Sequence, residues 1–249
     1  MLSHEKLKVY GKGLTVVASL ARHSAGWDKR HALVEQLCRA SESIVLNLAE
    51  GARLRSPSQK QQVLDYAVGS ALECAACLDI AVLKQFLMPE LATAEKRSLC
   101  EVVRMLVGLR RSWEKSALRE ESPVFGAASP EPQGYFAHEP LDVSQAGLSF
   151  MRWFNGLPAG AELASRLYRQ VDKAATSLLL NLAEGYGRTG EGDRLRFLQT
   201  AEASAVKAAA YLDLCVSKGE LDAERRQPGI DLLGRVVLML RALSGSWSE

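Results

Sequence analysis

The sequence contains the same unit twice, and this repeat restricts the fold more than any other feature. The segment Leu46–Gly51 recurs as Leu180–Gly185, 134 positions later. The same offset, without any insertion, relates residues 7–113 to residues 141–247. The chain is therefore a tandem duplication, and its fold must be built from two copies of one unit.

Apolar residues within each copy recur every three to four positions, which is the spacing of one helix face. The first copy shows it at Leu33, Leu37, Ala40, Ile44 and Leu48. No alternating β-branched segment of strand length is present. The spacing predicts an all-α fold with helices near 3–24, 28–50, 57–87, 91–118, 139–155, 159–184, 191–218 and 222–245. Short loops between long helices favour two antiparallel up-down four-helix bundles.

Residues 121–138 separate the two copies and are rich in proline and glycine. This composition predicts a linker. We expect one bundle in residues 1–120 and a second in residues 139–249. A flexible linker of this length spans roughly 20–25 Å, so we expect the bundles to lie side by side and parallel.

Several residues predict helix ends. Ser56, Pro57 and Gln59 have the pattern of an N-cap, a first helical residue and a capping-box partner. Gly51 and Gly185 are expected just past the second helix of each copy, in a left-handed conformation. Two weaker signals are Asp28 as an N-cap and Pro228 as the start of a helix or a kink in it.

Composition excludes some classes of protein. No uninterrupted apolar run approaches the 18 residues of a membrane span, and Glu5, Lys6 and Lys8 leave no signal sequence at the N-terminus. The five cysteines do not form a disulfide framework, which favours a reducing compartment. We therefore expect a cytoplasmic protein that does not contact a membrane.

Motifs for catalysis or for metal and cofactor binding are missing from the sequence. The four histidines have no metal-ligand spacing, and no glycine-rich phosphate loop is present. Cys74 and Cys77 lie in an apolar helical stretch and are expected to be buried hydrophobic residues. We predict no catalytic residue, no metal site and no cofactor, and an enzyme is the weakest of the alternatives.

The repeated polar residues could form a functional site or a structural one. They are Asn47, Glu50 and Gly51 in the first copy, and Asn181, Glu184, Gly185 and Arg188 in the second. We favour the structural role, because an asparagine near a helix end satisfies free backbone groups or fixes the packing register. The glutamates would hold the following loop through its amides, through Arg53 or through Arg188.

These motifs also carry a family resemblance. The run Ser43–Gly51, followed by Gly69–Glu73, and the run Asn181–Arg188 resemble the four-helix-bundle proteins of intervening sequences in bacterial 23S rRNA genes. That family includes the accessory variability determinant of diversity-generating retroelements, a ring-forming basic protein. The resemblance implies a bundle fold and, as partners, RNA or cDNA and a reverse transcriptase. This chain differs in being a fused pair with a net charge of only +2.

The basic charge belongs to the first copy. Residues 1–120 carry 18 Lys and Arg against 13 Asp and Glu, whereas residues 137–249 carry 13 against 14. Up-down topology would bring a set of cations to one end of the first bundle: Arg53, Arg55, Lys60, Arg110, Arg111, Lys115 and Arg119, with Lys6 and Lys8 nearby. Such a cluster suits phosphate, but cations at helix ends also occur simply as solvated complements of the helix dipole.

Two functions from different classes follow. The first is a non-enzymatic accessory protein that binds RNA or cDNA through the basic end and assists a retroelement reverse transcriptase. The alternative is a structural homo-oligomer without a nucleic-acid role, in which the second copy of one chain packs against the basic first copy of another. Contacts of that head-to-tail kind close into rings or continue as filaments.

Overall fold

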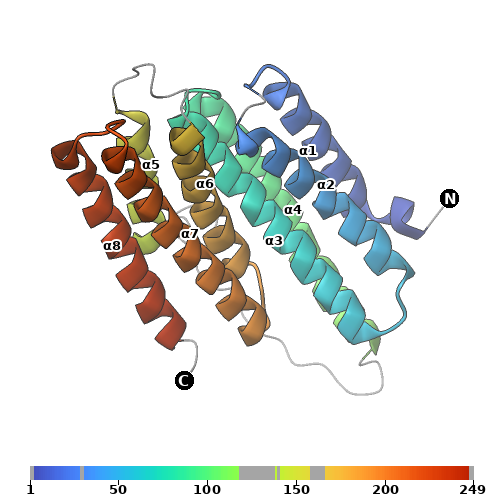
Figure 1. Ribbon diagram of the computed structural model, residues 1–249. Coiled ribbons are helices and arrows are strands. Elements are labelled where there is room, and N and C mark those ends of the chain that lie inside the picture. Colours follow the sequence, from blue (N-terminus) through green and yellow to red (C-terminus); the bar gives the residue numbers. More distant parts are fainter. Residues whose placement is uncertain (1–2, 29–30, 118–137, 139–140, 158–165, 247–249) are drawn as a thin grey trace.

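The computed structural model describes residues 3–28, 31–117, 138, 141–157 and 166–246. Within these residues the chain is all helical and contains no strand (Figure 1). A short 3-10 helix, η1 (Ser3–Lys6), precedes the α-helices. The α-helices are α1 (Lys8–Ser24), α2 (Ala32–Arg53), α3 (Pro57–Leu83), α4 (Pro89–Ala117), α5 (Asp142–Asn155), α6 (Arg166–Tyr186), α7 (Glu191–Ser217) and α8 (Ala223–Ser246).

The helices form two antiparallel four-helix bundles, α1–α4 and α5–α8, placed side by side (Figure 1). The second helix of copy two, α6, packs against the third helix of copy one, α3. Lys84, just after α3, pairs with Asp172 near the start of α6, and Thr189, after α6, donates a hydrogen bond to Asp65 near the start of α3. Helices α3 and α6 are therefore antiparallel, and the two bundles run parallel.

Helix α3 is the central helix of the molecule because it packs within its own bundle and against the other one. Small buried residues, among them Ala67, Gly69 and Ala76, allow neighbouring helices to approach closely on several sides. By length and composition α3 could cross a membrane, yet 67% of its most apolar window is buried inside the protein. A helix that is apolar all round is typical of a protein core.

The prediction that Gly51 and Gly185 end their helices is wrong. Both lie inside helices and are buried. A Cβ on Gly51 would come within 2.8 Å of Val63 and 3.2 Å of Trp113, so the glycine is needed for close packing of α2 rather than for a turn. Among the described residues, positive φ occurs at Gln85 and Gly219, equivalent positions that follow the third helix of each copy.

Other predicted helix ends were partly wrong. Pro57 is the first residue of α3 and Ser56 has the extended N-cap conformation, but the Ser56 side chain makes no capping bond and contacts Ser58 instead. Helix α2 begins after His31, not after Asp28. Pro228 lies inside α8, five residues after its start. The predicted linker, residues 121–138, lies outside the described residues except for its last position.

Candidate functional site

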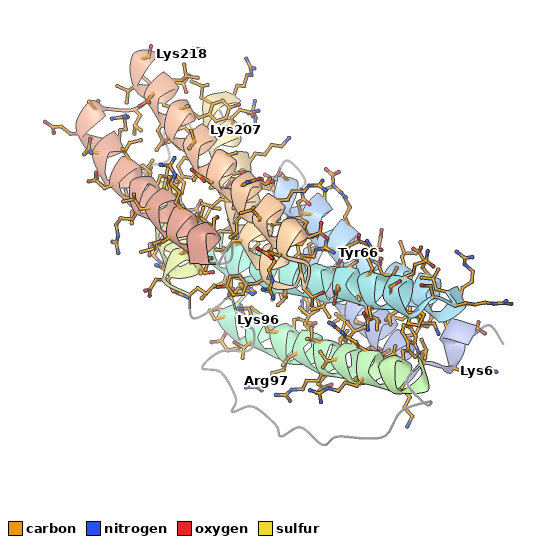
Figure 2. The ribbon with its side chains drawn as sticks, turned by 90° about the horizontal axis from the view of Figure 1, so that it is seen from below. Lys6, Tyr66, Lys96, Arg97, Lys207 and Lys218 are labelled. Carbon is orange, nitrogen blue, oxygen red and sulfur yellow. The ribbon has the colours of Figure 1, made fainter. Side chains whose placement is uncertain are left out.

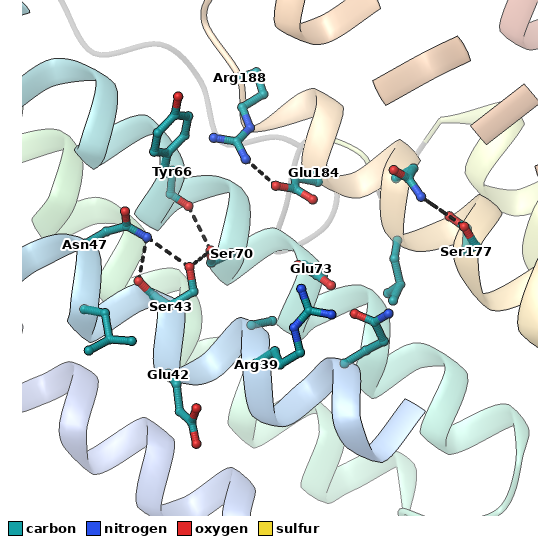
Figure 3. A pocket seen from close by; sticks show the side chains of 15 residues that line it. Arg39, Glu42, Ser43, Asn47, Tyr66, Ser70, Glu73, Ser177, Glu184 and Arg188 are labelled. Carbon is teal, nitrogen blue, oxygen red and sulfur yellow. Dashed lines mark hydrogen bonds and ion pairs between the residues drawn. The ribbon is translucent and has the colours of Figure 1, made fainter. Parts of the chain in front are cut away.

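A hydrogen-bond network surrounds the repeated asparagine of the first copy (Figure 3). Asn47 donates from Nδ2 to the backbone oxygen of Ser43 at 2.7 Å and to its Oγ at 2.9 Å. Ser70 of α3 donates to Ser43 Oγ at 2.8 Å or to the backbone oxygen of Tyr66 at 2.9 Å. The network therefore connects α2 to α3, and it gives hydrogen-bond partners to polar atoms that would find none in the apolar core.

The second copy contains the same network at the equivalent positions. Asn181 donates to the backbone oxygen of Ser177 at 2.7 Å, and Ser177 and Ser204 share a 2.9 Å hydroxyl bond. Ser204 also donates to the backbone oxygen of Thr200 at 2.8 Å. The network thus fixes the register of the second and third helices in each bundle, which is a structural role.

The two networks line one cleft between the bundles, which encloses about 710 Å³ (Figure 3). Helices α2 and α6 form its sides and α3 its floor. Charged side chains from both copies face it: Arg39, Glu42, Glu73, Glu184 and Arg188. Its two sides are the equivalent second helices of the two copies, but the duplication alone does not predict the cleft, because it depends on the packing of α3 against α6, which are not equivalent helices.

Arg188 joins the bundles at one end of this cleft. Its side chain pairs with Glu184, and its guanidinium lies 4.4 Å from the Tyr66 ring of copy one and 5.0 Å from the Phe197 ring of copy two. The residue is only 7% exposed. Its Nε and Nη1 are buried and have no hydrogen-bond partner among the residues that the structure describes. Close approach at this point needs glycine, because a Cβ on Gly187 would lie 2.7 Å from the Cα of Gly69.

Glu73 lies largely buried in the cleft, between cations and another carboxylate (Figure 3). Burial, with the negative charge of Glu184, raises the pKa of Glu73 from its ordinary 4.5 to about 7, although Arg39 and Arg188 act in the opposite direction. No hydrogen bond or ion pair to Glu73 is found within the described part of the chain. Its equivalent in copy two is Lys207, which is exposed on α7.

A second cluster joins the bundles at the opposite end of α3. Asp172 of α6 is buried and accepts from His31 Nδ1 at 3.1 Å and from Lys84. Burial would raise the pKa of Asp172, but the hydrogen bonds and positive charges of His31 and Lys84 outweigh it and hold that pKa below its usual value. The Lys84 side chain is itself buried. Removal of either charge would therefore leave the other one buried without a counter-charge.

Four of the predicted basic residues lie at one end of the first bundle, where α2 ends, α3 begins and α4 approaches its last turns: Arg53, Arg55, Lys60 and Arg111. Arg53, Arg55 and Arg111 are exposed there. Lys60 lies over the Trp113 ring, 5.0 Å from its centre, and is half-buried. Figure 2 shows Lys6 at this same end.

Three of the predicted basic residues stand apart from this exposed group. Arg110 pairs with Asp65 at 3.1 Å, so part of its charge is neutralised. The side chain of Lys115 lies outside the described part of the structure, and so does Arg119. Glu50 is exposed near Arg53 and makes the end less basic than the arginines alone suggest.

Sequence reasoning missed Tyr66, Glu73 and Asp172 as site residues. Each differs sharply from its repeat equivalent, which is Thr200, Lys207 and Cys38 respectively. Arg188, which it did single out, is equivalent to Leu54. The contact between the bundles is therefore made by residues that differ between the two copies, rather than by the repeated residues.

The cysteines Cys74 and Cys77 are buried as predicted, and burial raises the pKa of both thiols.

Comparison with known families connects this architecture to one group of proteins. The family model of the 23S rRNA-intervening sequence protein matches residues 5–108 and again residues 153–242. The chain belongs to this family. Searches of curated proteins and of solved structures found no match.

The two matches assign one family unit to each bundle, which agrees with the tandem duplication. The description of the family refers to an RNA gene and names no enzymatic activity.

Proposed function

We propose that this 23S rRNA-intervening sequence protein is a non-enzymatic accessory protein that binds RNA or cDNA through the basic end of its first bundle. The observation that carries the proposal is the exposure of Arg53, Arg55 and Arg111 at one end. Phosphate contacts of clustered cations release counterions, so binding of this kind depends weakly on sequence and steeply on salt. The family's RNA-related description supports it.

The test is fluorescence anisotropy with a labelled single-stranded RNA between 50 and 300 mM salt. We expect the triple variant Arg53→Glu, Arg55→Glu, Arg111→Glu to weaken binding and to reduce the slope of log affinity against log salt by about 2, as loss of three phosphate contacts requires. The matched control reverses three exposed cations of copy two, Lys173, Arg196 and Arg235. Affinity that ignores salt, or that survives the first triple reversal, rules the basic end out.

We further propose a retroelement reverse transcriptase as the protein partner, and the family resemblance of the repeated Asn-x-Ala-Glu-Gly motif supports it. A gene for such an enzyme next to this one, with a template and variable repeat pair, is the expected finding. Co-purification of the two proteins from cells that express both is the direct test. Absence of the gene and of co-purification would favour self-assembly instead.

Self-assembly is a second candidate because the duplication leaves two matching faces uncovered. Leu180 on α6 and Leu72 on α3 are 4% and 6% exposed where the bundles meet. Their repeat equivalents, Leu46 on α2 and Val206 on α7, are 66% and 52% exposed. Helix α7 of one chain and α2 of the next can therefore form a contact similar to the internal one, and repetition of this contact gives a ring or a filament.

The contact between α7 of one chain and α2 of the next would differ from the internal contact at the positions where the two helices lie closest. Arg53 and Ala203 stand where the internal interface has Gly187 and Gly69. Larger side chains keep α2 and α7 further apart, so less apolar area is buried and the association is weaker. Glu42 on α2 and Lys207 on α7 add charges of opposite sign (Figure 2 shows Lys207 on α7).

Light scattering across a range of protein concentrations tests this assembly. The expected result is a mass that rises with concentration. The double variant Leu46→Glu, Val206→Glu should raise the dissociation constant by at least tenfold, because it places charges in an apolar contact. Leu238→Glu is the control, since Leu238 is equally exposed but lies on α8. A monomer at all concentrations, or equal effects of the two changes, contradicts the proposal.

A further inference from the structure

The cleft between the bundles offers hydrogen-bond acceptors that no described side chain uses. Asn47 and Asn181 both donate from Nδ2 to serines within their own helices, which leaves each Oδ1 available. The carboxyl of Glu73 has no hydrogen-bond partner in the part of the chain that the structure describes. A molecule that occupies the cleft can therefore be held by N–H or O–H groups that it donates to these acceptors.

Arg188 closes one end of the cleft. It is more than nine-tenths buried there, pairs with Glu184 and lies over the Tyr66 ring. Its Nε and Nη1 have no hydrogen-bond partner among the described residues, but both atoms are shielded from solvent. A ligand in the cleft therefore does not reach these N–H groups, and the groups open to it are those of Glu73, Arg39 and the two asparagines.

Arg39 gives the cleft a donor at its open side. Its guanidinium lies beside Glu73 in the cleft (Figure 3), and Arg39 is exposed on α2. A carboxyl and a guanidinium side by side present an acceptor and a planar pair of donors to the same ligand. The matching ligand is flat and carries adjacent donors on one edge and adjacent acceptors on another.

Among the nucleic-acid bases, guanine has this pattern. Its N1–H and N2–H₂ groups are adjacent donors, and its O6 and N7 are adjacent acceptors that arginine recognises in a bidentate manner. Unpaired bases in RNA are read on these edges, and the cleft volume lies within the range of small-ligand pockets. We propose that the cleft binds an unpaired guanine nucleotide, with Glu73 as acceptor for its N–H groups and Arg39 as donor to O6 and N7.

This proposal rests on the nucleic-acid function proposed above and deepens it. Arg39 in the cleft and Arg53 at the basic end lie fourteen residues apart on α2, which is about 21 Å along the helix. One strand held by its phosphates at the basic end can thus place a base that lies several nucleotides away in the cleft. The basic end would supply affinity and the cleft would supply base selectivity.

Glu73 must be ionised to accept two N–H groups, so guanine binding requires release of its proton. The charged groups that face Glu73 are Arg39 and Glu42 on α2, Glu184 on α6 and Arg188 after it. Since the pKa of Glu73 is about 7, affinity for guanine should fall about tenfold for each pH unit below that value.

The experiment is calorimetric titration of the full chain with guanosine, inosine, adenosine and cytidine monophosphates. We expect the guanosine nucleotide to bind at least tenfold more tightly than the inosine nucleotide, which lacks the N2 amino group, and than the other two. Glu73→Gln and Arg39→Gln should each remove this preference. Lys207→Gln and Lys173→Gln, the same changes at the exposed repeat equivalents, should leave it intact. Circular dichroism establishes that all four variants fold.

The outcomes separate the cleft from the basic end. The variant with Arg53, Arg55 and Arg111 reversed should lose RNA affinity yet still bind the free guanosine nucleotide. Equal affinity for all four nucleotides, or a guanine preference that survives both Glu73→Gln and Arg39→Gln, overturns the proposal. Tighter binding of a free amino acid such as arginine or glutamate, tested in the same titration, would also overturn it.

Discussion

At the scale of single residues, burial decides the chemistry of Glu73. The carboxyl is largely buried in the wall of the cleft and Glu184 is close to it, so the neutral form is favoured. A raised pKa means that the folded protein holds this proton more tightly than the unfolded chain. Stability from this residue is therefore complete below pH 4.5 and is lost as pH rises through 7.

Glu73→Gln should accordingly stabilise the protein at pH 8, because the amide removes the cost of ionising a buried carboxyl. A pKa difference from 4.5 to about 7 corresponds to an effect on the order of 3 kcal/mol. Denaturant unfolding of both proteins at pH 5 and pH 8 measures it. The gain should be clearly larger at pH 8, and an equal gain at both values would contradict the assigned pKa.

At the scale of elements, the residues at the end of α6 contact α3, and this contact distinguishes copy two from copy one. Gly187 lets the chain pass close to α3, and Arg188 then lies over Tyr66. The first copy has Arg53 and Leu54 at these positions, and among the described residues no third helix of another bundle packs against its α2. The close approach and the cationic contact are therefore features of the interface between bundles, not of the bundle itself.

Arg188→Leu, which restores the residue of copy one, should destabilise the protein by about 2 kcal/mol, because it removes a cation from two aromatic rings and leaves Glu184 without its partner. Thermal unfolding followed by circular dichroism gives the change. Arg196→Leu on the exposed side of α7 is the control and should have little effect. Equal losses in the two variants would show that Arg188 has no special role.

At the scale of the whole molecule, charged clusters at both ends of α3 hold the bundles together. Asp172 belongs to one bundle, and both of its partners, His31 and Lys84, belong to the other. Because the pKa of Asp172 is lowered in the folded state, its contribution is present above the ordinary carboxyl pKa and is lost as pH falls through the folded value.

Asp172→Asn should lower the free energy of unfolding by about 3 kcal/mol at pH 7, since the buried Lys84 then lacks a counter-charge. The difference from the unchanged protein should shrink as pH falls through the lowered pKa of Asp172, where its carboxyl becomes neutral. Urea unfolding at a series of pH values from 7 downward measures both quantities. Asp231→Asn, on the exposed side of α8, is the comparison, and a loss that does not diminish as pH falls would contradict this role.

The helical fold and its duplication can both be predicted from the amino-acid sequence. Helix periodicity is a local property that each segment carries alone, and the Asn47 and Asn181 motifs stand in the same register, so neither inference needed the third dimension. Helix ends are harder to predict. A glycine such as Gly51 often ends a helix, but here its small size is required by Val63 and Trp113, which are distant in the sequence and pack against it.

Which helix of one copy packs against which helix of the other is seen only in the folded chain. A duplicated sequence presents equivalent faces twice, so periodicity cannot distinguish the pairing of α3 with α6 from that of α7 with α2. The difference lies in a few residues such as Arg188 and Asp172, whose partners are distant in the chain. The cleft with Glu73 exists because α3 pairs with α6 within one chain. The two copies are covalently linked, so this contact does not require two separate molecules to associate.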